Sequence, residues 1–126
     1  MTIAFASSEG KLIDQHFGWS KKFYLYQVDE YTSKFINEID SSDEPEEEKA
    51  KLEYKIGTID DADIMYCTQI GPTASKMVQS AGIHPVRVQE GEVIAEAISN
   101  LQEMLNSGNP PMWLLRMFHK AKERGA

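Results

Sequence analysis

The chain has 126 residues and a formal net charge of −7, with 41% hydrophobic and 26% charged residues. This length predicts a single domain over residues 1–126, and the composition excludes a disordered or fibrous protein because it supplies enough apolar surface for one core. No apolar run approaches the roughly 20 residues that cross a bilayer, and the start does not resemble a secretion signal, so we expect a cytoplasmic protein.

Cysteine count and charge distribution narrow the possible partners. Cys67 is the only cysteine, which excludes an intrachain disulfide and a four-thiolate iron-sulfur or zinc site built from one chain. Residues 110–126 carry a net charge of +3, and the rest of the chain carries −10. A nucleic-acid backbone requires clustered cations, which the acidic body lacks. We therefore expect neither nucleic acid nor a membrane as partner.

The first third of the chain predicts a strand, a long loop and a hairpin. Residues 2–7 are apolar and predict a strand, which is followed by a polar, glycine-containing loop that holds His16. Residues 22–29 and 34–39 alternate apolar and polar side chains across a short link. This alternation is typical of two strands paired in an antiparallel hairpin.

An acidic segment then predicts a helix. Ser41 or Ser42 is the candidate N-cap, and the carboxylates of residues 43–48 would occupy the first turns, where the helix dipole favours negative charge. The helix should run to about Ile56, with Leu52 facing inward. A solvated amphipathic helix explains these acidic residues better than a metal site does.

The second half of the chain predicts a βαβ unit. Residues 62–67 form a nearly continuous apolar run, the pattern of a strand covered on both faces. Pro72 stands at a first helical position, and the helix 73–81 ends at Gly82. Residues 84–89 complete the unit, and a right-handed crossover makes its two strands parallel.

Two further helices complete an α/β chain. Residues 92–105 carry apolar side chains at helical spacing, and residues 112–122 follow a Gly-Asn-Pro-Pro break and form a helical C-terminal tail within 110–126. The apolar side chains of this tail can serve packing or the docking of a partner; they are Trp113, Leu114, Met117 and Phe118.

Sheet geometry selects two residues that could bind a ligand. Cys67 ends its strand and thus points to the rim where ligands collect in open α/β sheets. The next helix begins near Gly71 and presents unpaired N–H groups there, which favours a thiolate. If the first strand runs parallel to this one, the loop after Ser7 delivers His16 to the same rim. His84 begins its strand, so we expect it at the opposite edge.

Each of these residues also has a purely structural interpretation. Cys67 can be a small core residue, His84 a packing residue, and His119 a solvated or capping residue. Cys67 with His16 as a base would suggest a cysteine hydrolase, but neither a signature around the cysteine nor a third residue that orients the histidine is evident. We therefore do not expect an enzyme.

Three segments carry a resemblance to a known family: IAFASSEGKLIDQHFG near the start, YCTQIGPTASKMVQSAGIHPVRV in the middle and GNPPMWLLRMF near the end. In this order they resemble the NifX-type members of the dinitrogenase iron-molybdenum cofactor biosynthesis family. The resemblance implies a ribonuclease-H-like, three-layer α/β/α fold around a mixed five-stranded sheet. It also implies a small, non-enzymatic carrier that holds an iron-sulfur precursor of the nitrogenase cofactor and passes it between scaffold and cluster-donor proteins.

The same resemblance maps the family's histidine onto His16 and its cysteine onto Cys67 as candidate iron ligands. Few protein ligands suit a carrier, because a preassembled cluster already satisfies most of its iron sites with sulfide. Positive potential would come from the helix start at Gly71, aided by Lys76 or Lys21. The alternative is a cluster-free chaperone or regulatory module that binds an apo-nitrogenase or scaffold protein through the tail. The remaining site candidates line the same loop: Ser7, Phe17 and Trp19.

Overall fold

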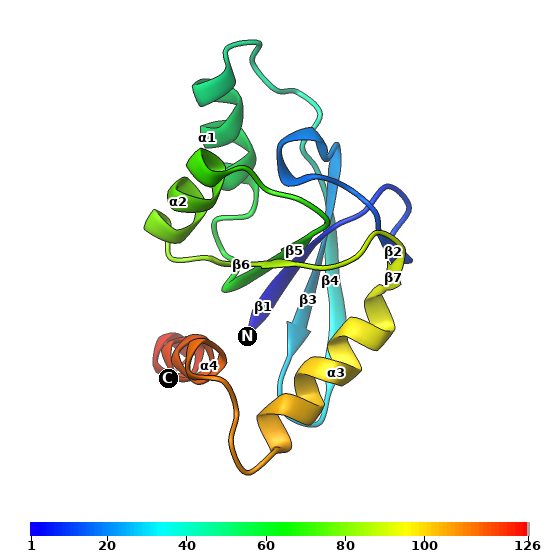
Figure 1. The fold of residues 1–126 in the computed structure, drawn as a ribbon, viewed down its shortest axis with the longest axis vertical. Helices are drawn as coiled ribbons and strands as arrows, with labels where there is room; N and C mark the ends of the chain where they lie inside the picture. The colour runs from blue at the N-terminus through cyan, green and yellow to red at the C-terminus, as the bar shows by residue number, and fades with distance from the viewer. Residues whose placement is uncertain (126) are drawn as a thin grey trace.

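The fold is organised around a mixed five-stranded sheet, which a computed structural model describes over residues 1–125 (Figure 1). The strand order is β4-β3-β1-β5-β6. β1, β5 and β6 run parallel, whereas β3 lies antiparallel to β1 and to β4. The strands are β1 Thr2–Ala6, β3 Lys22–Val28, β4 Ser33–Asp40, β5 Ile64–Cys67 and β6 His84–Arg87.

Helices cover both faces of this sheet, as Figure 1 shows. α1 (Glu48–Thr58) and α2 (Pro72–Ser80) pack on one face, over a core that includes Met65 and Cys67. α3 (Ile94–Asn106) and α4 (Met112–Gly125) pack on the other, over Phe5 and Tyr66. Alternate side chains of β5 thus enter opposite cores, because successive residues of a strand point to opposite faces. The predicted three-layer, ribonuclease-H-like fold is confirmed.

The helix predicted from the acidic segment begins later than expected. Its N-cap is Glu47 rather than Ser41 or Ser42, and the Glu47 carboxylate accepts hydrogen bonds from the N–H groups of Lys49 (3.2 Å) and Ala50 (2.7 Å). The backbone N–H and hydroxyl of Ser42 instead bond to Asp40, which holds the segment in a turn. The acidic residues before Glu47 therefore form a loop.

Short elements occur in the loop predicted to be irregular and at the start of the helix predicted over residues 92–105, which begins at Ile94 instead. β2 (Leu12–Ile13) pairs with β7 (Glu92–Val93) in a second, two-stranded sheet, and η1 (Phe17–Trp19) is a single 3-10 turn. Elements of two or three residues are too short to show a hydrophobic period, so the sequence pattern could not predict them.

The C-terminal helix α4 packs on the body of the protein through both its apolar and its charged side chains. Leu114 and Phe118 are buried in the α3-side core. Arg124 forms an ion pair with the buried carboxylate of Asp63. The Lys120 ammonium donates to the carbonyl of Gly82 (3.4 Å). Within residues 1–125, no helix is both long and apolar enough to span a membrane.

Candidate functional site

The predicted rim is present at the carboxyl ends of β1 and β5. β1 lies parallel to β5, so the loop that follows β1 runs past the end of β5. His16 forms an isolated parallel bridge with Gln69, in which the Phe17 N–H donates to the Gln69 carbonyl (2.9 Å). Main-chain pairing thus places His16 beside the residues that follow Cys67, and its expected arrival at this rim is confirmed.

A hollow of about 760 Å³ opens at this rim. Three segments form its walls: the η1 turn, the start of α1 and the start of α2. The lining combines apolar side chains with charged side chains from the first turn of α1. The lining residues are His16, Gly18, Trp19, Glu47, Glu48, Lys49, Leu52, Gln69, Ile70, Gly71, Pro72, Thr73, Ala74 and Met77.

The His16 imidazole is stacked on the indole of Trp19. Their ring centroids are 4.4 Å apart and their planes differ by 11°. His16 is half-buried, while Trp19 is 64% exposed, so the indole shields one side of the imidazole and leaves its own outer side to solvent. The stack presents an oriented imidazole, which is a suitable ligand for iron.

The start of α2 supplies hydrogen-bond donors to the same hollow. Gly71 is the N-cap and has no side chain with which to cap the helix, and Pro72 follows it at the first helical position. The amides of Thr73 and Ala74 are therefore left for an anionic ligand. The start of α1 differs because the Glu47 carboxylate already binds its first amides.

The lysines expected to add positive potential do not line this hollow. Lys21 is paired with Glu44 at 2.5 Å, and Lys76 lies exposed on α2 outside the lining set. Lys49 lines the hollow instead, together with the carboxylates of Glu47 and Glu48. The helix start at Gly71 thus remains the anion-attracting feature named from the sequence.

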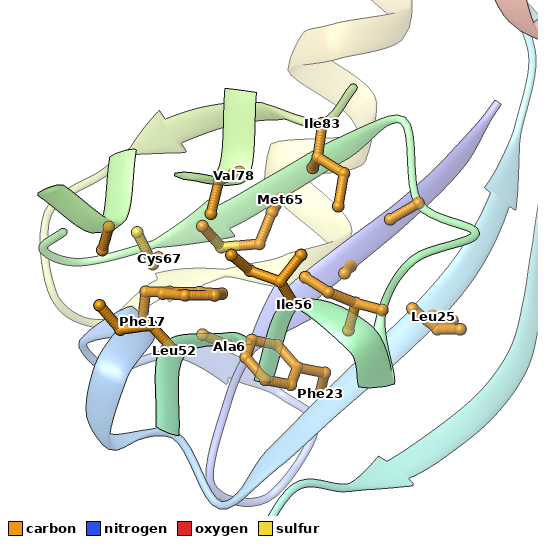
Figure 2. Packing of buried hydrophobic residues seen from close by; sticks show 14 residues of the cluster. Ala6, Phe17, Phe23, Leu25, Leu52, Ile56, Met65, Cys67, Val78 and Ile83 are labelled. Atoms are coloured by element: carbon orange, nitrogen blue, oxygen red, sulfur yellow. The ribbon is translucent and has the colours of Figure 1, made fainter. Parts of the chain in front are cut away.

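Cys67 lies beneath the hollow and not in its lining. Its side chain is fully buried, and Figure 2 shows it pointing with Phe17 into the core between the sheet and the helices α1 and α2. Burial raises the pKa of the Cys67 thiol to about 12, although the nearby backbone N–H groups of Phe17 and Gln69 act in the opposite direction. The expectation that the helix start makes Cys67 a thiolate is wrong, because removal from water outweighs the few donors.

This environment also disfavours the cysteine hydrolase. A nucleophilic cysteine requires an accessible thiolate, and Cys67 has neither solvent access nor a lowered pKa. Among the residues that the structure describes, no three His, Cys, Asp or Glu side chains gather in a way that could hold a metal ion.

The remaining candidates divide between lining and support. Gly71 and Trp19 line the hollow, whereas Phe17 is fully buried and packs on Phe23 at a centroid distance of 5.8 Å. Ser7 is also buried, and its hydroxyl accepts a hydrogen bond from the N–H of Gly10 (2.9 Å) within the turn after β1. Phe17 thus anchors the loop after β1 in the core, and Ser7 stabilises the turn at its start.

His84 lies apart from this rim, as expected. It begins β6 and pairs with Ile64 at the start of β5, and its ring is stacked on Trp113 of α4 at 4.3 Å. His119 is exposed on α4. Packing accounts for His84, and packing also accounts for the apolar side chains of the tail, since Leu114 and Phe118 are buried in the core.

Sequence reasoning missed Lys55, a fully buried lysine whose ammonium contacts the loop that carries Trp19. A signal for it existed, since Lys55 follows the predicted inward residue Leu52 by three positions and precedes Ile56 by one. These positions lie on one face of a helix. A charged residue on the buried face of a helix indicates a specific polar contact.

Comparisons with known proteins agree with the fold and the motifs. The family model described as dinitrogenase iron-molybdenum cofactor matches residues 1–104. Protein NifX of Azotobacter vinelandii is 34% identical over 123 residues, covering 97% of this chain and 77% of that protein. Protein NifX of Herbaspirillum seropedicae is 32% identical over 126 residues, covering 98% and 86%.

A solved structure supports the fold alone. The apo form of the orange protein from Desulfovibrio gigas matches with a TM-score of 0.61 at 19% identity, over 87% of this chain and 95% of that chain. The sequence matches and the observed strand order therefore confirm the resemblance drawn from the three motifs. The chain belongs to the dinitrogenase iron-molybdenum cofactor family.

Proposed function

We propose that this protein is a transient carrier of an iron-sulfur precursor of the nitrogenase iron-molybdenum cofactor. It receives the precursor from a cluster-donor or scaffold protein and releases it to another assembly protein, without changing it chemically. Membership of the family supports a role in this biosynthesis. A relative matched over a shorter segment, of Klebsiella pneumoniae, is named FeMo cofactor biosynthesis protein NifB.

The placement of His16 is the observation that carries the proposal. Its imidazole stands at a hollow of about 760 Å³, oriented by Trp19 and faced by the open start of α2. An iron-sulfur cargo needs a ligand for an open iron site, donors for its negative charge and apolar cover against water. His16, the first amides of α2, and the side chains of Ile70 and Met77 meet these three needs.

A single accessible ligand also suits release. Cluster iron that is mostly held by its own sulfides exchanges one protein ligand more readily than four. His16 makes the first contact with the iron of the cluster. Cys67 becomes the second ligand only after the core around it opens and the thiol loses its proton, a step that burial opposes. The closed core around Cys67 thus favours weak, reversible binding of the cluster over permanent binding.

Anaerobic titration with an isolated precursor cluster tests the assignment, with binding followed by the visible absorption of the cluster. His16→Ala should weaken binding at least about tenfold, because one coordination bond and its orientation are lost. His84→Ala is the matched control, since it removes the other imidazole that is stacked on a tryptophan. Equal affinities of the parent and the His16→Ala, Cys67→Ala double variant would eliminate both ligands.

The alternative role, a cluster-free chaperone that docks through the tail, has less support. Three cations of α4 already contact the body: Lys120 with Gly82, Lys122 with Glu30, and Arg124 with Asp63. The positive tail thus complements the acidic body of its own chain. A pull-down with cofactor-free assembly proteins would favour the chaperone if Met112→Ala and Arg116→Ala abolished capture while cluster affinity stayed normal.

A further inference from the structure

The buried side chain of Lys55 connects two walls of the hollow. Its ammonium donates to the backbone carbonyls of Ser20 at 2.6 Å and Ser41 at 3.1 Å, and it lies 3.2 Å from the Glu44 carboxylate. Ser20 follows Trp19 directly, at the end of the η1 turn. Ser41 and Glu44 belong to the loop that leads into α1. One charged group thus joins segments that are separated along the chain.

The surrounding bonds strengthen this junction. Glu44 also binds Lys21 at 2.5 Å, and the Ser41 N–H donates to the Lys21 carbonyl at 2.8 Å. The turn that carries Trp19 is therefore attached to the loop before α1 by both main-chain and side-chain bonds. Since η1 forms one wall of the hollow and the start of α1 forms another, these bonds set the distance between the two walls.

Burying the Lys55 ammonium costs free energy, which only specific polar contacts can offset. Burial lowers the pKa of Lys55, and the Glu44 carboxylate opposes that shift. A methionine would fill a similar volume without the cost of burying a charge, and buried ion pairs are weak evidence for stability alone. A methionine, however, cannot bond to two carbonyl oxygens at once. The chemistry points to orientation of the backbone rather than to filling of the core.

We propose that Lys55 is a positioning residue, whose ammonium fixes the His16–Trp19 stack relative to the start of α1. This inference goes beyond the carrier role, because it concerns the shape of the free protein. Loss of the ammonium should release the carbonyl of Ser20, let the η1 turn shift, and separate the indole of Trp19 from the imidazole of His16.

Fluorine NMR of the full chain labelled with 5-fluorotryptophan tests this directly. The two tryptophans give two resonances, and the ring current of a stacked imidazole displaces each of them. His16→Ala defines the unstacked position of the Trp19 resonance. In Lys55→Met, this resonance should move most of the way toward that position, while the Trp113 resonance, stacked on His84, should stay in place and report an intact fold.

Lys51→Met is the matched control. Lys51 lies one turn earlier on α1 and 3.8 Å from the same Glu44 carboxylate, yet it has no bond to Ser20 or Ser41, so both resonances should stay. Glu44→Gln keeps the volume and removes the counter-charge of Lys55, so the Trp19 resonance should move part of the way toward its position in His16→Ala. If Lys55→Met does not fold, an unmoved Trp19 resonance in Glu44→Gln would overturn the inference. An unmoved Trp19 resonance, or equal movement of both resonances, would overturn the inference. The NMR samples contain no cluster, so the result does not depend on whether the protein carries one.

Discussion

His16 and Trp19 lie as parallel rings at the mouth of the hollow, with centroids 4.4 Å apart. The same geometry recurs between His84 and Trp113, at 4.3 Å and 5°, where it serves the packing of α4. Stacking alone therefore does not identify a functional imidazole. What distinguishes His16 is its position beside an open hollow and the uncapped start of α2.

Removal of the indole should weaken cargo binding without unfolding the protein. Trp19→Ala deletes a stack worth about 1 kcal/mol, which corresponds to roughly a fivefold loss of affinity. The bound cluster should also decay faster in air, because the indole no longer covers the imidazole. Anaerobic titration and the decay of visible absorption measure the two effects. Tyr31→Ala removes another exposed aromatic ring and serves as the control; equal losses in both variants would argue against a specific role.

Cys67 should resist alkylation in the folded protein. Burial raises the pKa of its thiol from 9.0 to about 12, which lowers the thiolate fraction at pH 8 by about a thousandfold. Iodoacetamide should therefore react with the native protein far more slowly than with the protein in urea, as measured by mass spectrometry over time. Rapid labelling of the native protein, at the rate of free cysteine, would show that the core over Cys67 opens readily.

The docking of α4 should depend on pH through His84. Burial, and then the nearby charge of Arg116, lower the pKa of His84 below its ordinary value of 6.5. The folded state thus prefers the neutral imidazole, so stability is retained above pH 6.5 and falls as the pH drops through the folded-state pKa. Urea unfolding at pH 7.5 and 5.5 measures this change. His84→Phe keeps a ring against Trp113 and cannot titrate, so its stability should fall less over the same interval.

The tail helix should contribute strongly to global stability. Leu114 is fully buried against the α3-side core, so Leu114→Ala should cost about 2–5 kcal/mol of unfolding free energy. Met112 on the same helix is 75% exposed, and Met112→Ala should change stability by less than about 0.5 kcal/mol. Denaturant unfolding of both variants makes the comparison. Equal, small effects would mean that α4 docks only loosely.

Several elements could be predicted closely from local sequence. The strand, helix and strand at β5, α2 and β6 were all expected, because an apolar run, Pro72 at a first helical position and Gly82 at the helix end each constrain the backbone locally. The start of α1 was misplaced, because Glu47 rather than a serine caps it. Several acidic and serine residues in a row offer competing caps, and the winning one depends on the bonds of Asp40 and Glu44.

The sequence by itself determined the order and kind of the main elements, and it placed His16 in the loop after the first strand. The elements follow from residue periodicity, whereas the parallel pairing of β1 with β5, which brings His16 to the end of β5, was settled only by the tertiary structure. Only the tertiary structure decided that Cys67 is buried in the same core as Phe17, where burial raises the pKa of its thiol, and that Lys55 turns inward to Ser20 and Ser41. The solvent access and the pKa of Cys67 and Lys55 depend on side chains from distant parts of the chain, which cannot be inferred from the residues next to them in sequence.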